Sequence, residues 1–353
     1  MSQSKVAVFL GDDASPEVMV PTIALLEKMD VPITFEYPLV GQAALDVGGN
    51  RFPAASKAMV DNADASFFGS TSGDSTQALF YLRWGKQTYA NVRPCRWRPG
   101  FRSPLANPNT IDFVIVRENL EDLYLGLEGN LEDLAPLNLY SRHAKTAISQ
   151  LGSGQYAIKA ITESGSERVI RFAFELARQR QLKHKVTLTS KYNMLAKSDG
   201  LFRDIGHEVA RDYPDITFET FIVDDFLCRM ISQPEALDVV VMPNLYGDIM
   251  SDGAAGLIGG LGLAPSGCFG DNYAYFESAH GTAPDIQGQN IINPTATLLS
   301  ACMMLTHLGL HEAAHSIDQA ITEVYQQAEL RPFDQGGAAS TQTIFNAIEA
   351  LIL

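Results

Sequence analysis

Short runs of β-branched and apolar residues alternate along this chain with longer stretches in which apolar residues recur at helical spacing. The strand-like runs lie at residues 6–10, 65–69, 113–116, 186–189 and 237–242, and the helical stretches at 17–28, 167–180 and 201–211. This alternation predicts an α/β fold built around a mostly parallel sheet. No G-x-G-x-x-G follows a strand and no G-x-x-x-x-G-K-S/T occurs, so neither a Rossmann turn nor a P-loop is predicted.

The length of the chain indicates about two domains. Its 353 residues exceed the ~100–200 residues of a typical domain. No repeat or long linker divides the sequence, so we expect the domains to be interleaved. Between residues 128 and 155 the apolar pattern gives way to Leu, Asn, Gly and Ser. We interpret this segment as an excursion that packs on a partner chain.

Composition excludes several classes of protein. With 46% hydrophobic and 19% charged residues, the chain is typical of a globular protein. Its net charge of −15 repels phosphate backbones and anionic lipids, so we expect neither nucleic acid nor a membrane as a partner. The four cysteines are far apart and predict a reducing, cytoplasmic location. The longest apolar stretch, 253–264, is too short to span a bilayer.

Acidic residues follow two predicted strands. Asp248 and Asp252 lie four residues apart just after the strand at 239–242, so on a helix their carboxylates share one face. Such a pair suits a hard divalent cation, although two acids also stabilise a helix N-terminus. Asp224 follows a predicted strand at 220–223. Because ligands bind at the carboxyl ends of parallel strands, we expect these three acids to converge.

Three arginines form a possible basic counterpart to these acids. Arg83, Arg93 and Arg117 lie near the ends of predicted elements. Arginine binds carboxylates through two parallel hydrogen bonds, so the three together predict a clamp for a dicarboxylate. Each of them alone is more typical of a surface ion pair, and only the three together favour the clamp.

One short motif points to different chemistry. Residues 311–315 read HEAAH and match the H-E-x-x-H zinc motif, in which two histidines bind the metal and the glutamate acts as a base. A catalytic zinc needs a third protein ligand. We therefore interpret His311, Glu312 and His315 as the polar start of a helix.

Six ordered motifs cover nearly the whole chain. They read LR-x5-YANVRP (82–94), VREN-x-E-x-LY (116–124), SKYN (190–193), IVDD (222–225), NLYGDIMSD (244–252) and E-x-x-HGTAPDI (277–286) with NP at 293–294. Together they resemble the β-decarboxylating dehydrogenases, the family of isocitrate, homoisocitrate, isopropylmalate and tartrate/malate dehydrogenases. TYANVRP, GLAPSG and APDI-x-G are most similar to the homoisocitrate enzymes.

The resemblance implies an isopropylmalate-dehydrogenase-like two-domain fold with a mostly parallel central sheet and a non-Rossmann NAD site. Residues 1–98 and 254–353 would form the large, cofactor-binding domain. Residues 99–253 would form the small domain, which carries the dimer interface and the arm at 128–155. Lys191 and Asp224 match residues that reach into the neighbouring subunit's site, which implies a homodimer with shared active sites.

The resemblance also implies the chemistry, an NAD-dependent oxidative decarboxylation of a 3-substituted (R)-malate to a 2-oxo acid and CO₂. Tyr124 matches the general acid, and Lys191 or a linked aspartate such as Asp252 the base. The malate carboxylates would be bound by Arg83, Arg93 and Arg117, with Asn193 beside Lys191 at the same substrate. The ligands of Mg²⁺ or Mn²⁺ would be Asp224, Asp248 and Asp252.

For the cofactor, the family uses a loop in place of a Rossmann turn. The residues at its adenosine-binding positions are Glu277, His280, Gly281, Ala283, Asp285, Ile286 and Asn293. Asp285 stands where NADP-dependent members carry Lys, and Ile286 where they carry Tyr. A carboxylate accepts hydrogen bonds from ribose hydroxyls and repels a 2′-phosphate, so NAD is favoured.

The variable group of the substrate would lie near residues 72–83. Four residues before Arg83 this chain has Leu79, where isocitrate enzymes carry Asn. Three residues before Arg83 it has Phe80, where homoisocitrate enzymes carry Arg. This favours an apolar 3-substituent, as in isopropylmalate. Isocitrate or homoisocitrate is the alternative, because Ser72 in a shortened loop supplies polar contacts. Two further alternatives are that Leu79 and Phe80 simply pack in the core, and that the chain is a non-catalytic regulatory subunit.

The chain departs from the family pattern at two loops. The family's GDGIGPEV reads GDDASPEV at 11–18, so Asp13 and Ser15 replace glycines. Leu120 and Asp122 replace a Thr and a Gly of the tyrosine motif. If Asp13 or Ser15 occupies a position of positive φ, we expect the first loop to be rebuilt near the nicotinamide.

Overall fold

A computed structural model describes residues 3–353, and its centre is one mixed ten-stranded sheet. The strand order is β11-β10-β12-β5-β4-β13-β14-β3-β1-β2. Six of the nine pairings are parallel, and the antiparallel ones join β4 to β5, β4 to β13 and β13 to β14. The strands are β1 (Ser4–Phe9), β2 (Ile33–Glu36), β3 (Ala65–Phe68), β4 (Ala90–Arg96), β5 (Asp112–Glu118), β10 (Lys185–Ser190), β11 (Thr217–Ile222), β12 (Val239–Met242), β13 (Pro265–Phe269) and β14 (Ala274–Ser278).

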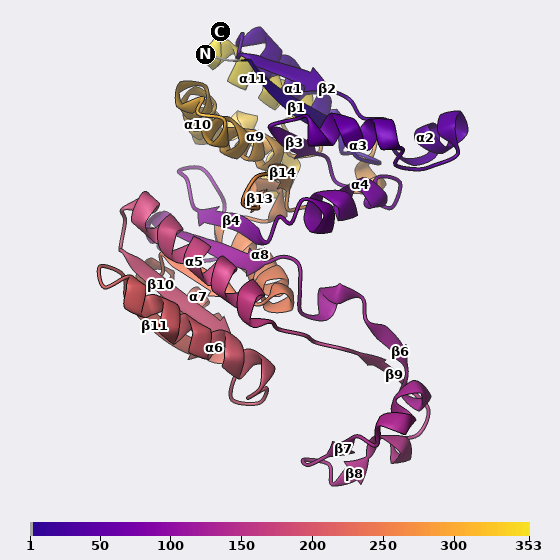
Figure 1. Cartoon of the computed structure of the whole chain (residues 1–353). Coiled ribbons are helices and arrows are strands. Elements are labelled where there is room, and N and C mark those ends of the chain that lie inside the picture. Colours follow the sequence, from indigo (N-terminus) through magenta and orange to yellow (C-terminus); the bar gives the residue numbers. More distant parts are fainter. Residues whose placement is uncertain (1–2) are drawn as a thin grey trace.

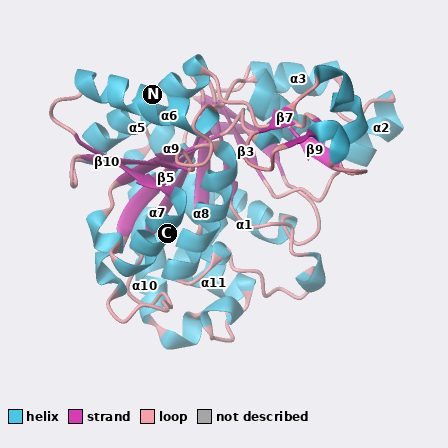
Figure 2. Ribbon diagram, turned by 90° about the horizontal axis from the view of Figure 1, so that it is seen from below, coloured by secondary structure: helices cyan, strands magenta, loops and turns pink. Residues whose placement is uncertain are grey.

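Helices flank the sheet (Figure 2). They are α1 (Pro16–Lys28), α2 (Gly41–Gly48), α3 (Ala54–Asp61), α4 (Thr76–Phe80), α5 (Glu163–Arg180), α6 (Ser198–Val209), α7 (Val223–Ser232), α8 (Asn244–Ile258), α9 (Thr295–His307), α10 (His311–Gln326) and α11 (Thr341–Ile352). The α/β prediction is confirmed. Each predicted strand overlaps an observed one, and α5 begins earlier than periodicity indicated because the Thr162 side chain caps it by accepting from the Gly165 N–H, 3.0 Å away.

Two lobes share the sheet, and both chain ends lie in one of them (Figure 1). The lobe with the termini holds α1, α9, α10 and α11, and the other holds α5, α6 and α7. The largest hydrophobic core joins residues of both lobes, such as Ile23 of α1 and Phe226 of α7. The predicted boundary at 253/254 would divide α8, the helix whose first turns carry the acids. None of the helices described between residues 3 and 353 has both the length and the apolar character of a membrane span.

The segment interpreted as an excursion is an arm that extends away from the body (Figure 1). It contains two small antiparallel sheets, β6 (Glu128–Asn130) with β9 (Gln155–Ala157), and β7 (Tyr140–Ser141) with β8 (Thr146–Ala147). Large apolar side chains along it are exposed, among them Leu137 at 62% and Tyr140 at 60%. A two-stranded sheet alone is marginally stable in water, so the arm presents apolar surface that its own fold does not bury.

Candidate active site

The site lies where β4 and β5 run antiparallel in the middle of the sheet, beneath the start of α8. Successive side chains of a strand point to opposite faces. Arg93 of β4 and Arg117 of β5 point to the face that α8 covers, whereas Val92 and Val114 belong to the other core, with α5. The two elements approach so closely that a Cβ on Gly247 of α8 would lie 2.5 Å from the Arg117 Cβ. Only glycine fits at this position.

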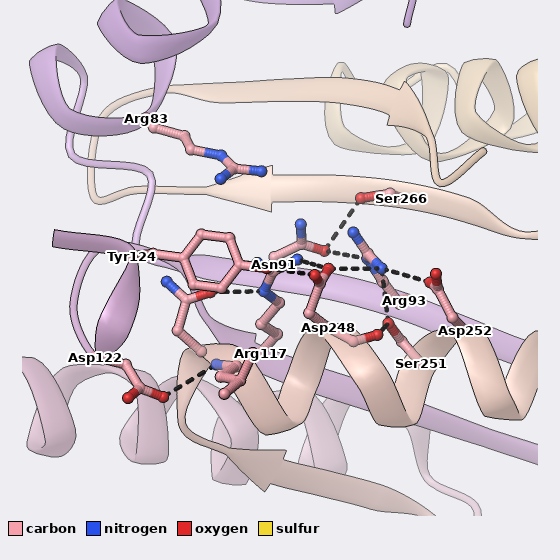
Figure 3. A network of polar contacts seen from close by, with 12 residues as sticks. Arg83, Asn91, Arg93, Arg117, Asp122, Tyr124, Asp248, Ser251, Asp252 and Ser266 are labelled. Atoms are coloured by element: carbon pink, nitrogen blue, oxygen red, sulfur yellow. Dashed lines mark hydrogen bonds and ion pairs between the residues drawn. The ribbon is translucent and has the colours of Figure 1, made fainter. Parts of the chain in front are cut away.

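Arg117 is the centre of the first group of contacts (Figure 3). Its Nε donates to Oδ1 of Asn244 at 2.8 Å, and its Nη1 donates to Oδ1 of Asp248. The Tyr124 hydroxyl donates to the other Asp248 oxygen at 2.5 Å, and the Arg117 guanidinium lies 4.9 Å from the centre of the Tyr124 ring. Arg117 is 1% exposed, so it does not form a surface ion pair.

Arg93 is the centre of a second group of contacts. Its Nη1 donates to Ser251 Oγ at 2.7 Å and to Asp252 Oδ1 at 3.2 Å, and lies 3.7 Å from Asp248 Oδ1. Its Nε donates to the Asn91 side chain at 3.3 Å. Both aspartates therefore lie on the face of α8 that meets the sheet, as the spacing of four residues predicted.

The pKa values of the two aspartates are shifted in opposite directions. Burial alone would raise the pKa of Asp248, but Arg117, the Tyr124 hydrogen bond and Arg93 outweigh it and hold this pKa below its usual value. Burial and the Asp248 charge raise the pKa of Asp252. Burial and the Asp248 carboxylate also raise the pKa of Tyr124, which keeps its hydroxyl protonated. A divalent cation between the two carboxylates would relieve the repulsion that Asp252 experiences.

The expected convergence of the three acids does not occur among the described residues of one chain, and a metal site shared between two copies stays a prediction. Asp224 lies in the first turn of α7, because β11 ends at Ile222 and Val223 already belongs to the helix. Its carboxylate pairs with Nζ of Lys191, which follows β10, and Asn193 is exposed nearby in sequence. Within residues 3–353, no three His, Cys, Asp or Glu side chains are grouped so that they could hold a metal. The donors fit a hard cation at Asp248 and Asp252, and the rest of its coordination must come from outside this chain.

Arg83 lies in a π-helical turn, Tyr81–Gly85, that continues α4. Its Nε donates to the Tyr275 hydroxyl at 3.3 Å. Leu79 packs against the core, whereas Phe80 is 51% exposed with its ring centre 5.2 Å from that of Trp84. Core packing therefore accounts for Leu79 and not for Phe80.

The loop before α4 is organised by an aspartate of the first loop. Asp12 Oδ2 accepts hydrogen bonds from Thr71 Oγ1 at 2.7 Å and from the backbone N–H of Ser72 at 2.8 Å. Asp13 has a φ of 52° and Ser15 a helical φ of −57°. Asp13 thus holds a left-handed backbone conformation where the family motif has a glycine, whereas Ser15 does not.

The predicted cofactor loop follows β14, where Glu277 lies near the strand end. Burial raises the pKa of Glu277, against the charges of Arg83 and other arginines. Nδ1 of His280 lies 2.8 Å from the Gly281 carbonyl, and its Nε2 is buried with no hydrogen-bond partner. An orphaned ring nitrogen fits a ligand hydroxyl such as that of a ribose.

Beyond this histidine the loop forms one turn, Pro284–Ile286. Ala283 precedes it with a φ of 50°, Asp285 is exposed, and Ile286 packs beside Ala14, Val18 and Ile292. The Asn293 side chain is bonded within the protein, donating to Asp334 at 3.1 Å and accepting from the Thr295 N–H at 3.0 Å. A cavity of about 580 Å³ lies between this loop and the first one, lined by Asp13, Glu17 and Gly288 among others.

Sequence reasoning missed residues that hold the site. Asn244 and Ser251 stand in the recognised NLYGDIMSD motif, yet only their bonds to Arg117 and Arg93 reveal their roles. Asp12 stands in the first loop with no local pattern that indicates its partner. The zinc-like segment begins α10, and His311, Glu312 and His315 are exposed there.

Comparisons with known proteins agree with this geometry. The family model for isocitrate/isopropylmalate dehydrogenase matches residues 5–348. The chain is 40% identical to the 3-isopropylmalate/3-methylmalate dehydrogenase of Methanocaldococcus jannaschii, covering 96% of this chain and 95% of that one. It is 37% identical to the isocitrate/homoisocitrate dehydrogenase of Thermus thermophilus, covering 98% of each.

The structure matches that of isocitrate dehydrogenase from Methylococcus capsulatus with a TM-score of 0.85 and 35% identity, covering 99% of both chains. The similar identities to isopropylmalate and isocitrate/homoisocitrate enzymes do not separate the two substrate classes. The chain therefore belongs to the isocitrate/isopropylmalate dehydrogenase family and is a decarboxylating dehydrogenase.

Proposed function

We propose that the protein catalyses the NAD-dependent, Mg²⁺- or Mn²⁺-dependent oxidative decarboxylation of a 3-substituted (R)-malate whose 3-substituent is apolar, as in isopropylmalate. The observation that carries the proposal is the exposure of Phe80, which lies three residues before Arg83. Its ring is half-exposed and so is free to contact a substrate. Arg51 contacts the loop before α4, but its Nη1 is already paired with Oδ1 of Asp74 at 2.6 Å. A carboxylate buried against Phe80 would be left without a partner, which costs several kcal/mol, whereas each buried CH₂ gains about 0.8 kcal/mol.

The arginines would bind the two carboxylates that all these malates share. Arg93 and Arg117 are nearly buried and converge on Asp248 from adjacent strands, so their guanidinium groups are held in fixed orientations. A divalent cation held by Asp248 and Asp252 would supply Lewis-acid polarisation of the substrate's oxygens. Tyr124, whose raised pKa keeps it protonated, would donate a proton to the substrate carbon after CO₂ leaves.

The proton of the substrate hydroxyl would be taken by Lys191 of a second copy of the chain. Lys191 and Asp224 form a solvent-facing pair, with side chains 29% and 61% exposed, and they do not join the Asp248 group within one chain. The exposed apolar arm supports the same homodimer, because a second copy would bury it. We also propose that NAD is the cofactor and the cytoplasm the location, on the basis of Asp285 and of the unpaired cysteines.

A panel of malates tests the proposal. The purified protein is assayed for NADH and NADPH production with Mg²⁺ or with EDTA, on 3-isopropylmalate, 3-methylmalate, isocitrate and homoisocitrate. We expect the highest kcat/KM with 3-isopropylmalate and NAD, and none with EDTA. A kcat/KM highest for isocitrate or homoisocitrate would show that the apolar-pocket argument fails.

A further inference from the structure

A buried cluster of three charged residues lies behind the active site. The carboxylates of Asp122 and Asp199 are fully buried, and the Lys159 side chain between them is 14% exposed. The Lys159 ammonium lies 2.7 Å from Asp199 Oδ1 and 3.4 Å from Asp122 Oδ1. It also lies 4.4 Å from the centre of the Tyr246 ring. Two buried carboxylates thus depend on one cation.

In each carboxylate, one oxygen accepts a hydrogen bond from a backbone N–H and the other faces the Lys159 ammonium. Oδ2 of Asp122 accepts from the backbone N–H of Leu245 at 3.0 Å, and Oδ2 of Asp199 accepts from the backbone N–H of Lys191 at 2.6 Å. The Oδ1 atoms have no hydrogen-bond partner other than the ion pairs to Lys159. The ammonium is therefore the cation that joins the two halves of the cluster, and the Tyr246 hydroxyl faces the same two carboxylates, whose charges add to burial in raising its pKa.

The cluster connects three parts of the site. Asp122 lies two residues before Tyr124, and Leu245 lies in the first turn of α8, three residues before Asp248. Lys191 is bound through its own N–H. Lys159 itself follows β9, at the base of the arm. One ammonium thus contacts, through two carboxylates, the chain segments of the tyrosine, the lysine and the metal helix.

The backbone of Asp122 is strained for a residue that carries a side chain. Its φ of 69° and ψ of −145° form a conformation that L-residues rarely adopt and glycine adopts easily. The related family motif has a glycine at this position. In this chain an aspartate accepts the backbone strain, and its carboxylate has two partners, the Leu245 N–H and Lys159.

We propose that Lys159 is a positioning residue: held between Asp122 and Asp199, its ammonium fixes the Tyr124 loop, the Lys191 turn and the start of α8 in one arrangement. The roles of Tyr124 and Lys191 rest on the proposed function, whereas the arrangement itself does not. Without the ammonium, two like charges would remain buried with one oxygen each unpaired. The segments would then separate or admit water, and the reactive groups would shift from their productive positions.

The test compares Lys159→Met, which removes the charge at similar length, with Arg180→Met as a matched control. Arg180 Nε donates to Asp238, another fully buried carboxylate, at 3.0 Å, and Asp238 also accepts a backbone N–H, that of Lys183. Both variants therefore leave a buried carboxylate without its cation. Only Lys159→Met removes the cation that contacts the segments of Tyr124 and Lys191.

Amide hydrogen exchange gives a readout that does not depend on turnover. In Lys159→Met, we expect peptides containing Lys191 and Leu245 to exchange at least tenfold faster, while Arg180→Met leaves them unchanged. Unchanged exchange at both amides in Lys159→Met would overturn the proposal, and so would equal acceleration in the control. If the wild type turned over none of the malates, the proposed function would fall, and exchange would still decide this inference.

Kinetics add a second readout. We expect Lys159→Met to lower kcat roughly 10- to 100-fold with KM for malate and NAD changed less than threefold, because ligand contacts remain and the reacting groups move. Asp122→Gly suits the backbone conformation and removes one carboxylate. If the cluster acts as a unit, the double variant Lys159→Met/Asp122→Gly should lose no more kcat than Lys159→Met alone. Additive losses in the double variant, or a kcat within twofold of wild type in Lys159→Met, would show that the cluster does not act as a unit.

Discussion

The hydroxyl of Tyr124 donates a hydrogen bond to Oδ2 of Asp248 across 2.5 Å, while Arg117 binds the other oxygen of the same carboxylate. Asp248 is thus the point at which the tyrosine loop, β5 and α8 meet. A carboxylate bonded on both oxygens has one fixed orientation, and it fixes its partners in turn.

Tyr124→Phe removes a proton donor and keeps the ring on Arg117. We expect kcat to fall by about 10²–10⁴-fold with little change in KM, because a general acid acts in the transition state. The lost hydrogen bond should lower the free energy of unfolding by only about 1 kcal/mol. Steady-state kinetics and urea unfolding check both, with the exposed Tyr37→Phe as control. A kcat within threefold of wild type would exclude Tyr124 as the acid.

Asp252→Asn keeps the shape of the side chain and removes one of the two carboxylates on α8. We expect Mg²⁺ affinity, measured by calorimetry with substrate present, to fall at least tenfold, because an amide carries no charge to hold the cation. Activity should then require correspondingly more Mg²⁺. Asp204→Asn, an exposed change on α6, is the control. Normal activity of Asp252→Asn at limiting Mg²⁺ would contradict the metal assignment.

Cofactor choice is tested at the exposed turn after Ala283. Asp285→Lys with Ile286→Tyr should shift the ratio of kcat/KM for NADP over NAD upward by at least tenfold, since it removes a repulsive carboxylate and adds a cation for the 2′-phosphate. Asp285→Asn alone should shift it less. Because Ile286 packs beside Ala14 and Val18, thermal unfolding must accompany the kinetics. A wild type that already prefers NADP would refute the assignment.

Phe80→Arg places a cation three residues before Arg83. Phe80 is half-exposed, so we expect the free energy of unfolding to change by no more than about 0.5 kcal/mol. The ratio of kcat/KM for homoisocitrate over 3-isopropylmalate should rise at least tenfold, because the added charge pairs with the extra carboxylate. Phe80→Ala removes the ring without adding charge and should weaken 3-isopropylmalate only. If the ratio stays constant in Phe80→Arg, Phe80 does not face the variable group.

Glu118 should make stability depend on pH. Burial raises the pKa of this carboxyl from 4.5 to about 7, against the backbone N–H groups of Leu120 and Glu121 that bind it. Between these two values the folded protein keeps a proton that the unfolded chain has released. The free energy of unfolding therefore falls as pH rises through this window, by up to about 3 kcal/mol.

Glu118→Gln replaces the carboxyl by an amide that does not titrate. It also removes one of the two oxygens that accept hydrogen bonds. Urea unfolding at pH 5 and pH 8 should show a smaller difference in Glu118→Gln than in wild type, whereas the exposed Glu128→Gln should match wild type. Equal pH differences in all three proteins would mean that Glu118 is ionised throughout.

Local pattern was sufficient to predict the acid pair on α8 and the helix that carries it, because a spacing of four residues fixes the face of a helix. It was not sufficient for Asp224. Strands β11 and β12 both end before an acid, yet β10 lies between them in the sheet. Strand order depends on pairings between distant parts of the chain, and no local spacing encodes it.

The charged cluster was missed for a related reason. Lys159 stands in an unremarkable stretch, YAIKAIT, and its partners are 37 and 40 residues away in sequence. In the sequence, Asp122 is visible only as a departure from the family's glycine. A buried ion pair becomes visible only once tertiary contacts show which charges have lost their water.

The interleaving of the two lobes has a consequence for the synthesis of the protein. Strand β3 ends at Phe68 and pairs with β14, which begins at Ala274, and α1 packs against α9 and α11. The ribosome adds the intervening residues, about 200 of them, in roughly 10–40 s. Throughout that time the apolar faces of β1, β3 and α1 lack their final neighbours. The nascent chain must therefore keep its first lobe unfinished, and exposed to chaperones, until almost the last helix has emerged.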